Sequence, residues 1–267
     1  MGVVSGTSGY SQSLERGLAI LSAFKPGRPL LGVSEVAREV RLSRSTAYRY
    51  IATLAELGYL RQDTDTRKYR LGPRVLDLGF SAINSMELRE ISRPQLQQLS
   101  DETGHTVNMA ILDGADIVYI ERVRSSAQRQ REIDLNLHIG SRLPAYCTSM
   151  GKVLLAFLPD EELRARLRDV ELTQRGPNTI TVGSAFATEL ARVRQEGLAV
   201  NNEELAYGLR SIAAPVRTQS GDVVAAINLA VHRSMVSMKD LVAHLGPALK
   251  RSAGEISAHL GYRPAEA

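Results

Sequence analysis

Apolar residues near the start of the chain recur every three or four positions, which is the period of an amphipathic helix. In residues 11–24 the expected inward stripe consists of Leu14, Leu18, Leu21 and Phe24. Prolines and a glycine follow directly and would end this helix.

Two more short helices are expected next. The first covers residues 35–40, with Ser34 as its N-cap. The second starts at Ser43 or Ser45 and runs to about residue 57, where Gly58 would end it. The residues expected on its inward face are Ala47, Ile51, Leu54 and Ala55.

Residues 59–61 and 68–71 alternate between polar and apolar side chains around a polar turn, which predicts a two-stranded hairpin. Three helices and a hairpin in about 60 residues predict a winged helix-turn-helix domain over residues 11–72, after a disordered tail of residues 1–10. Residues 73–86 predict a linker helix. This helix either joins two copies of the chain or packs wholly on its own domain.

The remaining chain predicts a second domain over residues 87–262. Helices are expected at residues 88–103, 149–158, 160–170, 184–196 and 238–260, with Pro247 as a possible kink in the last. Strands are expected at residues 105–112, 117–123, 132–138, 198–201, 211–216 and 223–231. Hairpins mixed with helices indicate an α+β domain, with one antiparallel sheet flanked by helices.

Composition fits a folded protein of two domains. The chain has 267 residues, of which 43% are hydrophobic and 23% are charged, so a buried core is feasible. The single cysteine, Cys147, excludes an internal disulfide framework and suits a reducing cytoplasm. The sequence shows neither an apolar run of membrane-spanning length nor a secretory signal, so a cytoplasmic protein without membrane contact is expected.

The positive charge is concentrated in the first third of the chain. Residues 1–86 hold 12 Lys/Arg against 7 Asp/Glu, whereas residues 87–267 hold 21 against 22. A basic first domain joined to a nearly neutral second one is typical of a polyanion-binding domain attached to a regulatory domain.

The start of the third helix carries the candidate DNA contacts. In a recognition helix the first turns enter the major groove, where arginines bind guanine edges and hydroxyl groups reach bases or phosphates. The expected DNA-binding residues are Ser43, Arg44, Ser45, Thr46, Tyr48 and Arg49, with Arg67 and Lys68 of the hairpin as phosphate contacts. Because some winged helices bind proteins instead, a protein-interaction module remains the alternative.

An enzyme built on the second domain, with Cys147 and His105 as its reactive groups, is a further alternative. The five histidines show no metal-ligand spacing with the cysteine or with each other, so neither a metal nor a cofactor is expected. A buried structural thiol is the favoured interpretation of Cys147, and no catalytic residue is assigned.

Five separated stretches resemble the IclR family of bacterial transcription regulators. They are SLERGLAILSAF, LSRSTAYRYIATLAELGYL, KYRLGPRVLDLG, LPAYCTSMGKVLLA and EELAYGLRSIAAPV, in this order. AYCTSMGKVLLA and GLRSIAAPV, which lie in the fourth and fifth of these stretches, are most similar to the branch that regulates aromatic-acid catabolism through the β-ketoadipate pathway (the PcaR, PcaU and PobR type). The resemblance implies a DNA-binding domain, an effector-binding domain of GAF-like fold, and a dimer or dimer of dimers on palindromic operators.

The resemblance also implies an effector pocket. Its family positions correspond here to Leu143, Ser149, Met150, Asn201, Ser211, Asn228 and Ala230. Related members often have Asp and Ser where this chain has Asn201 and Ala230. A helix starting at Ser149 would offer free N–H groups to a carboxylate, and a neutral Asn201 would not repel one. A small carboxylate, either an aromatic acid or a β-ketoadipate-type intermediate, is therefore the expected effector.

Overall fold

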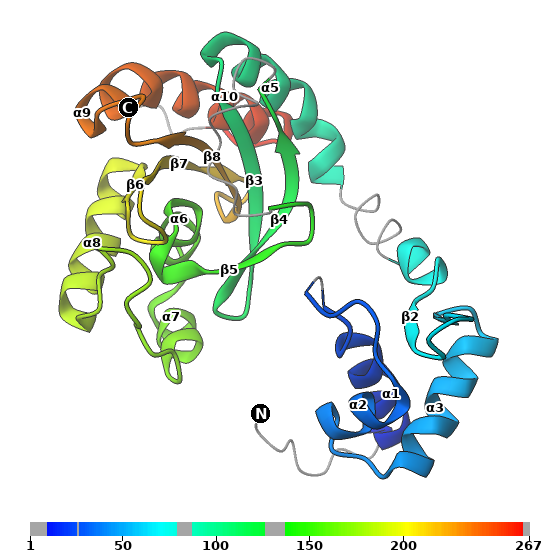
Figure 1. Cartoon of the computed structure of the whole chain (residues 1–267). Helices are drawn as coiled ribbons and strands as arrows, with labels where there is room; N and C mark the ends of the chain where they lie inside the picture. The colour runs from blue at the N-terminus through cyan, green and yellow to red at the C-terminus, as the bar shows by residue number, and fades with distance from the viewer. Residues whose placement is uncertain (1–9, 26, 79–86, 126–136, 264–267) are drawn as a thin grey trace. The chain divides into compact units, whose positions relative to one another are not determined.

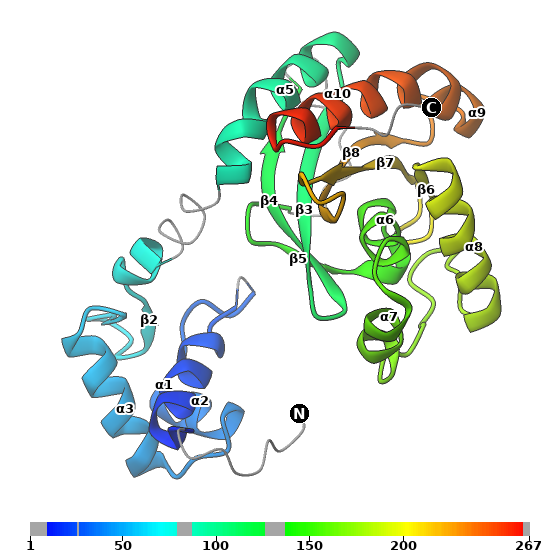
Figure 2. The same ribbon diagram turned by 180° about the vertical axis from the view of Figure 1, so that it is seen from behind.

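The computed structural model describes residues 10–25, 27–78, 87–125 and 137–263, which form two units, Met1–Ser85 and Met86–Ala267. Figure 1 and Figure 2 show both units from opposite sides. The N-terminal unit contains, in order, α1 (Gln12–Ser22), α2 (Val33–Glu39), α3 (Arg44–Glu56), β1 (Leu60–Gln62) and β2 (Tyr69–Leu71). The two strands pair antiparallel, which confirms the winged helix-turn-helix.

Two helices of this unit begin with different kinds of cap. Ser43 is the N-cap of α3, and its hydroxyl accepts a hydrogen bond from the Thr46 N–H at 3.1 Å. The expectation that Ser34 caps α2 is wrong. The N-cap is Gly32, whose N–H donates to Glu35 Oε2 at 2.8 Å, so the acidic side chain performs the capping.

The inward stripe expected for α1 is also wrong in part. Leu14 and Leu18 are 63% and 54% exposed, whereas Ile20 and Phe24 are buried. Helix α1 carries two apolar stripes side by side, and its packing against α3 buries the one through Ile20. The small core that results consists of Ile20, Ala23, Phe24, Leu31, Val36, Ile51, Leu60 and Tyr69.

Residues 74–78 are helical, as expected for the start of the linker helix. The rest of that expected helix, residues 79–86, lies outside the described residues.

The C-terminal unit is built on one antiparallel sheet of six strands in the order β5-β4-β3-β8-β7-β6. The strands are β3 (Thr106–Asp113), β4 (Asp116–Val123), β5 (Arg142–Pro144), β6 (Ala199–Asn202), β7 (Leu209–Arg217) and β8 (Val223–His232). The sequence did not predict β5. The strand expected at residues 132–138 falls mainly outside the described residues, and residues 137 and 138 are not in a strand.

Helices cover both faces of this sheet (Figure 1). The helices α5 (Glu87–Thr103) and α10 (Gly246–His259) share one apolar core with the first face. The second face packs against α6 (Ser149–Ala156), beyond which lies α8 (Gly183–Glu196). Two short helices, α7 (Asp160–Leu167) and α9 (Met238–Asp240), complete the unit. The α+β class with a flanked antiparallel sheet is thereby confirmed.

The closing helix is interrupted, in contrast to the continuous helix expected over residues 238–260. A π-helical turn, Leu241–Leu245, separates α9 from α10. Pro247 occupies the first turn of α10, where its missing N–H leaves no hydrogen bond unmade.

Candidate functional site

The amino-terminal turn of α3 is open to solvent. Arg44, Ser45, Tyr48 and Arg49 are all exposed, while the next residues inward on this helix pack on the core. Ser43 differs because its hydroxyl is already bound within the turn, to Thr46 N–H and to the Thr46 hydroxyl at 2.8 Å. The Ser45 hydroxyl lies 3.1 Å from the Ser43 hydroxyl, so the exposed groups that can reach a ligand without breaking a bond within the turn are the guanidinium groups of Arg44 and Arg49 and the phenol of Tyr48.

The hairpin adds cations beside this helix. Arg67 is exposed at its tip, with a left-handed φ of 58°. Lys68 is less available than expected, because its ammonium group lies 3.1 Å from Glu35 Oε2 on α2. Two arginines that sequence reasoning missed, Arg61 and Arg70, lie directly opposite each other on β1 and β2 and are both exposed. Like charges that face each other across a hairpin repel, so this pair favours a polyanionic partner.

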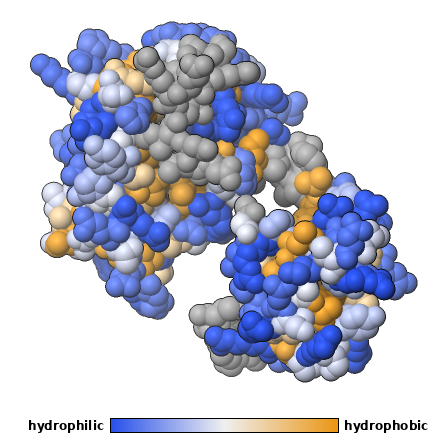
Figure 3. All heavy atoms as spheres, in the orientation of Figure 1, coloured by the Kyte–Doolittle hydropathy of each residue, from blue (hydrophilic) through white to orange (hydrophobic). Residues whose placement is uncertain are grey.

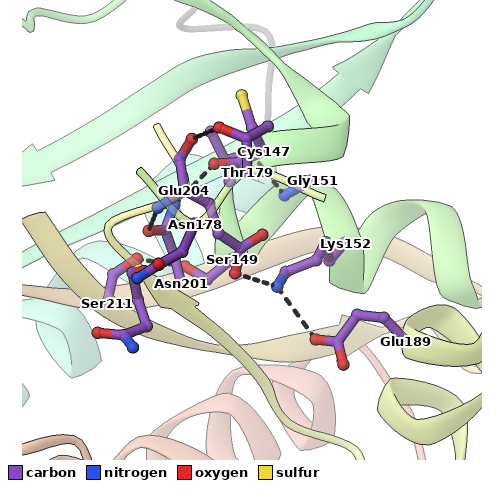
Figure 4. Close-up of polar contacts among 12 residues, drawn as sticks. Cys147, Ser149, Gly151, Lys152, Asn178, Thr179, Glu189, Asn201, Glu204 and Ser211 are labelled. Atoms are coloured by element: carbon purple, nitrogen blue, oxygen red, sulfur yellow. Dashed lines mark hydrogen bonds and ion pairs between the residues drawn. The ribbon is translucent and has the colours of Figure 1, made fainter. Parts of the chain in front are cut away.

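In the C-terminal unit, α6 packs on the face of the sheet where β6, β7 and β8 carry most of the expected effector residues. Its N-cap is Thr148, whose hydroxyl accepts the Gly151 N–H at 3.1 Å. Gly151 N–H is thus unavailable to a carboxylate, and the N–H groups of Ser149 and Met150 remain. The Ser149 hydroxyl is buried and lies 2.7 Å from the Ser211 hydroxyl of β7 (Figure 4).

Strand pairing brings several expected residues onto the α6 face of the sheet. Asn201 on β6 lies opposite Ser211 on β7, and Ser211 lies opposite Ala230 on β8. Asn228 shares this face, two residues from Ala230. These four residues and Ser149 form one cluster, called here the sheet-end cluster.

The other two expected effector residues have different surroundings. Met150 is fully buried in the apolar core between α6 and the sheet. Leu143 is half-buried on β5, which is the edge strand opposite to the β6 strand of Asn201.

Asn201 connects two segments that border the sheet-end cluster. Its amide nitrogen donates to the Cys147 carbonyl oxygen at 2.7 Å, and its amide oxygen accepts from Glu204 N–H at 3.1 Å. Both ends of this side chain therefore tie the segment before α6 to the loop after β6, as Figure 4 shows.

A buried ion network joins α6 to α8 and to the loop after β6. Lys152 on α6 is only 1% exposed, and its ammonium group lies 2.7 Å from Glu204 Oε1 and 3.0 Å from Glu189 Oε1 of α8 (Figure 4). Glu189 is also bound by Arg192 at 2.8 Å. Sequence reasoning missed this network, because its partners are 37 and 52 residues from Lys152.

The two carboxylates of the network respond differently to burial. Burial raises the pKa of Glu204 above its usual value, although Lys152 acts against this rise. Burial also acts to raise the pKa of Glu189, but hydrogen bonds from Arg192 and the charge of Lys152 outweigh it, and the pKa of Glu189 is lowered. Glu204 is therefore the carboxylate that depends most on Lys152 for its charge.

A second polar row crosses the same sheet face. The Arg122 guanidinium donates to Asn108 Oδ1 at 2.9 Å, and Asn108 Nδ2 donates to Asn228 Oδ1 at 2.8 Å. Asn108 and Asn228 are both buried. The row extends the sheet-end cluster to β3 and β4, and sequence reasoning identified only Asn228.

The geometry around Cys147 does not favour thiol chemistry. The side chain is buried, and burial raises the pKa of its thiol to about 11, so the reactive thiolate form is scarce at neutral pH. His105 is buried at the start of the sheet region. Among the described residues, no group of three or more His, Cys, Asp or Glu side chains is placed to hold a metal ion. No described helix is long and apolar enough to cross a membrane.

Comparison with known proteins agrees with this arrangement of two functional surfaces. Residues 13–64 match the IclR helix-turn-helix domain, and residues 80–258 match the family described as bacterial transcriptional regulator IclR C-terminal. The chain is 38% identical to the Pca regulon regulatory protein of Pseudomonas putida over 92% of this chain and 82% of that protein. The latter similarity confirms the branch that the sequence motifs indicated.

Two solved structures extend the comparison. The Thermotoga maritima IclR structure is 30% identical, with a TM-score of 0.73, and the match covers 95% of this chain and all (100%) of that one. An IclR homolog from Microbacterium hydrocarbonoxydans, complexed with 4-hydroxybenzoate, is 25% identical with a TM-score of 0.79 and coverage of 93% and 99%. The relatives named here are regulators and not enzymes, so the enzyme alternative is set aside. The chain belongs to the IclR family of bacterial transcriptional regulators.

Proposed function

We propose that the protein is a one-component cytoplasmic regulator that binds palindromic operator DNA as a dimer or tetramer and responds to a small carboxylate. The observation that carries the DNA part is the exposed amino-terminal turn of α3, with Arg44 and Arg49 in a unit that holds the chain's excess positive charge. Arginines at this place in a recognition helix meet base edges in the major groove. The cations of the wing hairpin would bind phosphates.

The proposed division of the chain assigns DNA binding to residues 11–72, linking to residues 73–86 and effector binding to residues 87–262. It is supported by separate hydrophobic cores, one in the N-terminal unit and two on the faces of the six-stranded sheet. A domain with its own core keeps its fold when the other domain changes state.

Exposed apolar side chains of the N-terminal unit support self-association. Leu14 and Leu18 lie four residues apart on one face of α1, and Leu76 and Leu78 lie in the helical stretch after the wing. All four are more than half exposed. Figure 3 shows hydrophobic residues at the surface of this otherwise hydrophilic unit. Apolar patches of this kind mark protein–protein contacts, and a second copy of the chain would cover them and place two α3 helices on a palindrome.

The sheet-end cluster is the proposed effector site. It offers the hydroxyl hydrogen that the Ser149–Ser211 pair leaves unused, the amide of Asn228 and the first N–H groups of α6, and each of these can donate to a carboxylate. Asn201 adds no negative charge. The 4-hydroxybenzoate complex of the homolog and the Pca regulon relative support an aromatic acid or a β-ketoadipate-type intermediate as the ligand. The ligand would control DNA binding by favouring one arrangement of the domains.

Gel retardation tests this proposal directly. The protein is titrated on the DNA upstream of its own gene at several salt concentrations, with and without 4-hydroxybenzoate. We expect specific binding whose affinity falls steeply as salt rises, because phosphate contacts release counterions. No retardation even at low salt, with or without the acid, would favour the protein-interaction alternative.

Arg49→Ala is expected to weaken binding to the operator by about 1 to 3 kcal/mol and to relax sequence preference at one base position. The reason is that Arg49 is exposed on the amino-terminal half of α3, where a side chain reaches base edges. The measurement is the affinity for a set of single-base operator variants. Arg70→Ala is the matched control: it should weaken all sequences equally and lower the salt slope by about 0.9. An unchanged preference in Arg49→Ala would remove Arg49 from base recognition.

Ser149→Ala is expected to weaken binding of 4-hydroxybenzoate by about 10-fold to 100-fold, because a hydrogen bond to a charged group contributes about 1.5 to 3 kcal/mol. The measurement is the rise in melting temperature with ligand concentration. Operator binding without ligand should stay unchanged. Ser184→Ala, on the exposed surface of α8, is the control with the same chemical change. If the ligand stabilises both variants as it does the wild type, the ligand binds elsewhere.

A further inference from the structure

The row formed by Arg122, Asn108 and Asn228 has a fixed direction. Each residue lies directly opposite the next on adjacent strands, in the order β4, β3, β8. Arginine has donors only, so Asn108 must accept with its oxygen and is left to donate with its nitrogen. Asn228 must then accept with its own oxygen. The charged residue at one end therefore determines the orientation of both amides.

Burial makes this orientation hard to reverse. Asn108 is 1% exposed and Asn228 is 5% exposed. If either amide turned over, two donors or two acceptors would face each other, and unpaired polar groups at buried positions are costly. Asn228 Nδ2 makes no hydrogen bond to another described residue. The free end of the row is therefore a donor.

This donor lies in the sheet-end cluster. Asn228 is opposite Ala213 on β7, and Ser211 is two residues along that strand. Toward β7 and along β8, the neighbours of Asn228 on this face include Ala213 and Ala230, whose small side chains carry no hydrogen-bonding group, and the Ser211 hydroxyl, which is bonded to Ser149, follows two residues along β7. A ligand at the cluster would meet the amide nitrogen of Asn228.

We infer that Arg122 and Asn108 are specificity-determining positioning residues, which hold Asn228 as a hydrogen-bond donor and so make the site select a ligand that presents only acceptors, such as a carboxylate. The inference rests on the proposed effector site. Neither residue needs to touch the ligand. A donor-only group of the same shape, such as an amidinium, would meet the Asn228 nitrogen donor to donor and be rejected.

Arg122→Gln tests this selection, because glutamine can donate or accept and no longer fixes the direction of the row. Binding of 4-hydroxybenzoate and of 4-hydroxybenzamidine is measured by calorimetry on the full-length protein. We expect the preference for the carboxylate to fall at least tenfold in Arg122→Gln. Arg122→Lys, which keeps a donor-only cation, should retain the preference of the wild type.

Arg124→Gln is the control for charge alone. Arg124 is exposed just beyond β4, and its replacement removes the same charge without touching the row. We expect it to keep the carboxylate preference. The inference is overturned if Arg122→Gln keeps the preference, or if Arg124→Gln loses it to the same extent.

A measurement without ligand tests the row independently of which effector the protein binds. If the wild type binds neither probe, the aromatic acid is the wrong effector class, and the row is judged by hydrogen exchange of the Asn108 side-chain amide in protein labelled with 15N-asparagine. Faster exchange of this amide in Arg122→Gln than in Arg124→Gln supports a row oriented by Arg122. Equal exchange in both variants overturns it.

Discussion

Lys152→Met is expected to lower the free energy of unfolding of the C-terminal unit by about 3 to 5 kcal/mol, the usual cost of removing one partner from a buried ion pair. The substitution keeps most of the apolar volume but leaves Glu204 without the cation that lies 2.7 Å from it. Melting followed by calorimetry should show a decrease of roughly 6 to 20 °C for a unit of this size.

The loss of stability in Lys152→Met, relative to the wild type, should depend on pH. Burial raises the pKa of Glu204, so the folded state binds this proton more tightly than the unfolded chain, and stability falls as pH rises above the usual glutamate value of 4.5. Loss of Lys152 steepens this fall, and the variant should be closer to the wild type at pH 5 than at pH 8.

Two further variants test whether the loss of stability comes from the unpaired charge of Glu204. Lys239→Met, at an exposed position of α9, should leave the melting temperature nearly unchanged. Adding Glu204→Gln to Lys152→Met should recover part of the lost stability, because it removes the unpaired charge. A Lys152→Met protein that melts like the wild type at pH 8 would show that the network does not stabilise the fold.

Gly151→Ala is expected to destabilise the C-terminal unit by about 3 kcal/mol or more, because overpacking here meets backbone and not a movable side chain. A Cβ at this position would lie 2.2 Å from the Ala145 carbonyl oxygen and 2.4 Å from Ala145 Cα. Either α6 or the turn Ala145–Cys147 must move, and both support the Ser149 hydroxyl. Chemical denaturation and ligand-dependent melting should both show the loss.

Gly254→Ala is the matched control with the opposite expected sign. Gly254 lies in the interior of α10, and a Cβ there meets nothing within 4 Å. Alanine should therefore stabilise the helix by about 0.5 to 1 kcal/mol. Equal stability of Gly151→Ala and Gly254→Ala would contradict the close packing of α6 on its preceding turn.

The N-terminal unit was largely predictable, because its signals are local. The cap of α3, expected at Ser43 or Ser45 and found at Ser43, the inward face through Ala47 and Ile51, and the hairpin all follow from residues a few positions apart. The error at Leu14 and Leu18 has a physical reason. A helix with two adjacent apolar stripes does not reveal which one meets its own core.

The C-terminal unit was predictable in its elements but not in its side-chain contacts. Strand β5 has only three residues, too few for a period to be recognised. Asn108 and Asn228 are 120 residues apart and meet only because β3 pairs with β8, which no local pattern encodes. The resemblance to a family indicated Asn228, whereas the residue that orients it, Arg122, became visible only through the register of the sheet.

Arg61 and Arg70, which lie opposite each other on β1 and β2, make the wing sensitive to the salt concentration. Mobile anions in solution relieve their mutual repulsion, and so does a phosphate group from the double helix. Anions from the buffer and phosphates of the operator therefore compete for the same β1–β2 hairpin. At low salt the free hairpin is least stable and its affinity for DNA is highest. At high salt the hairpin is more stable and its affinity for DNA is lower.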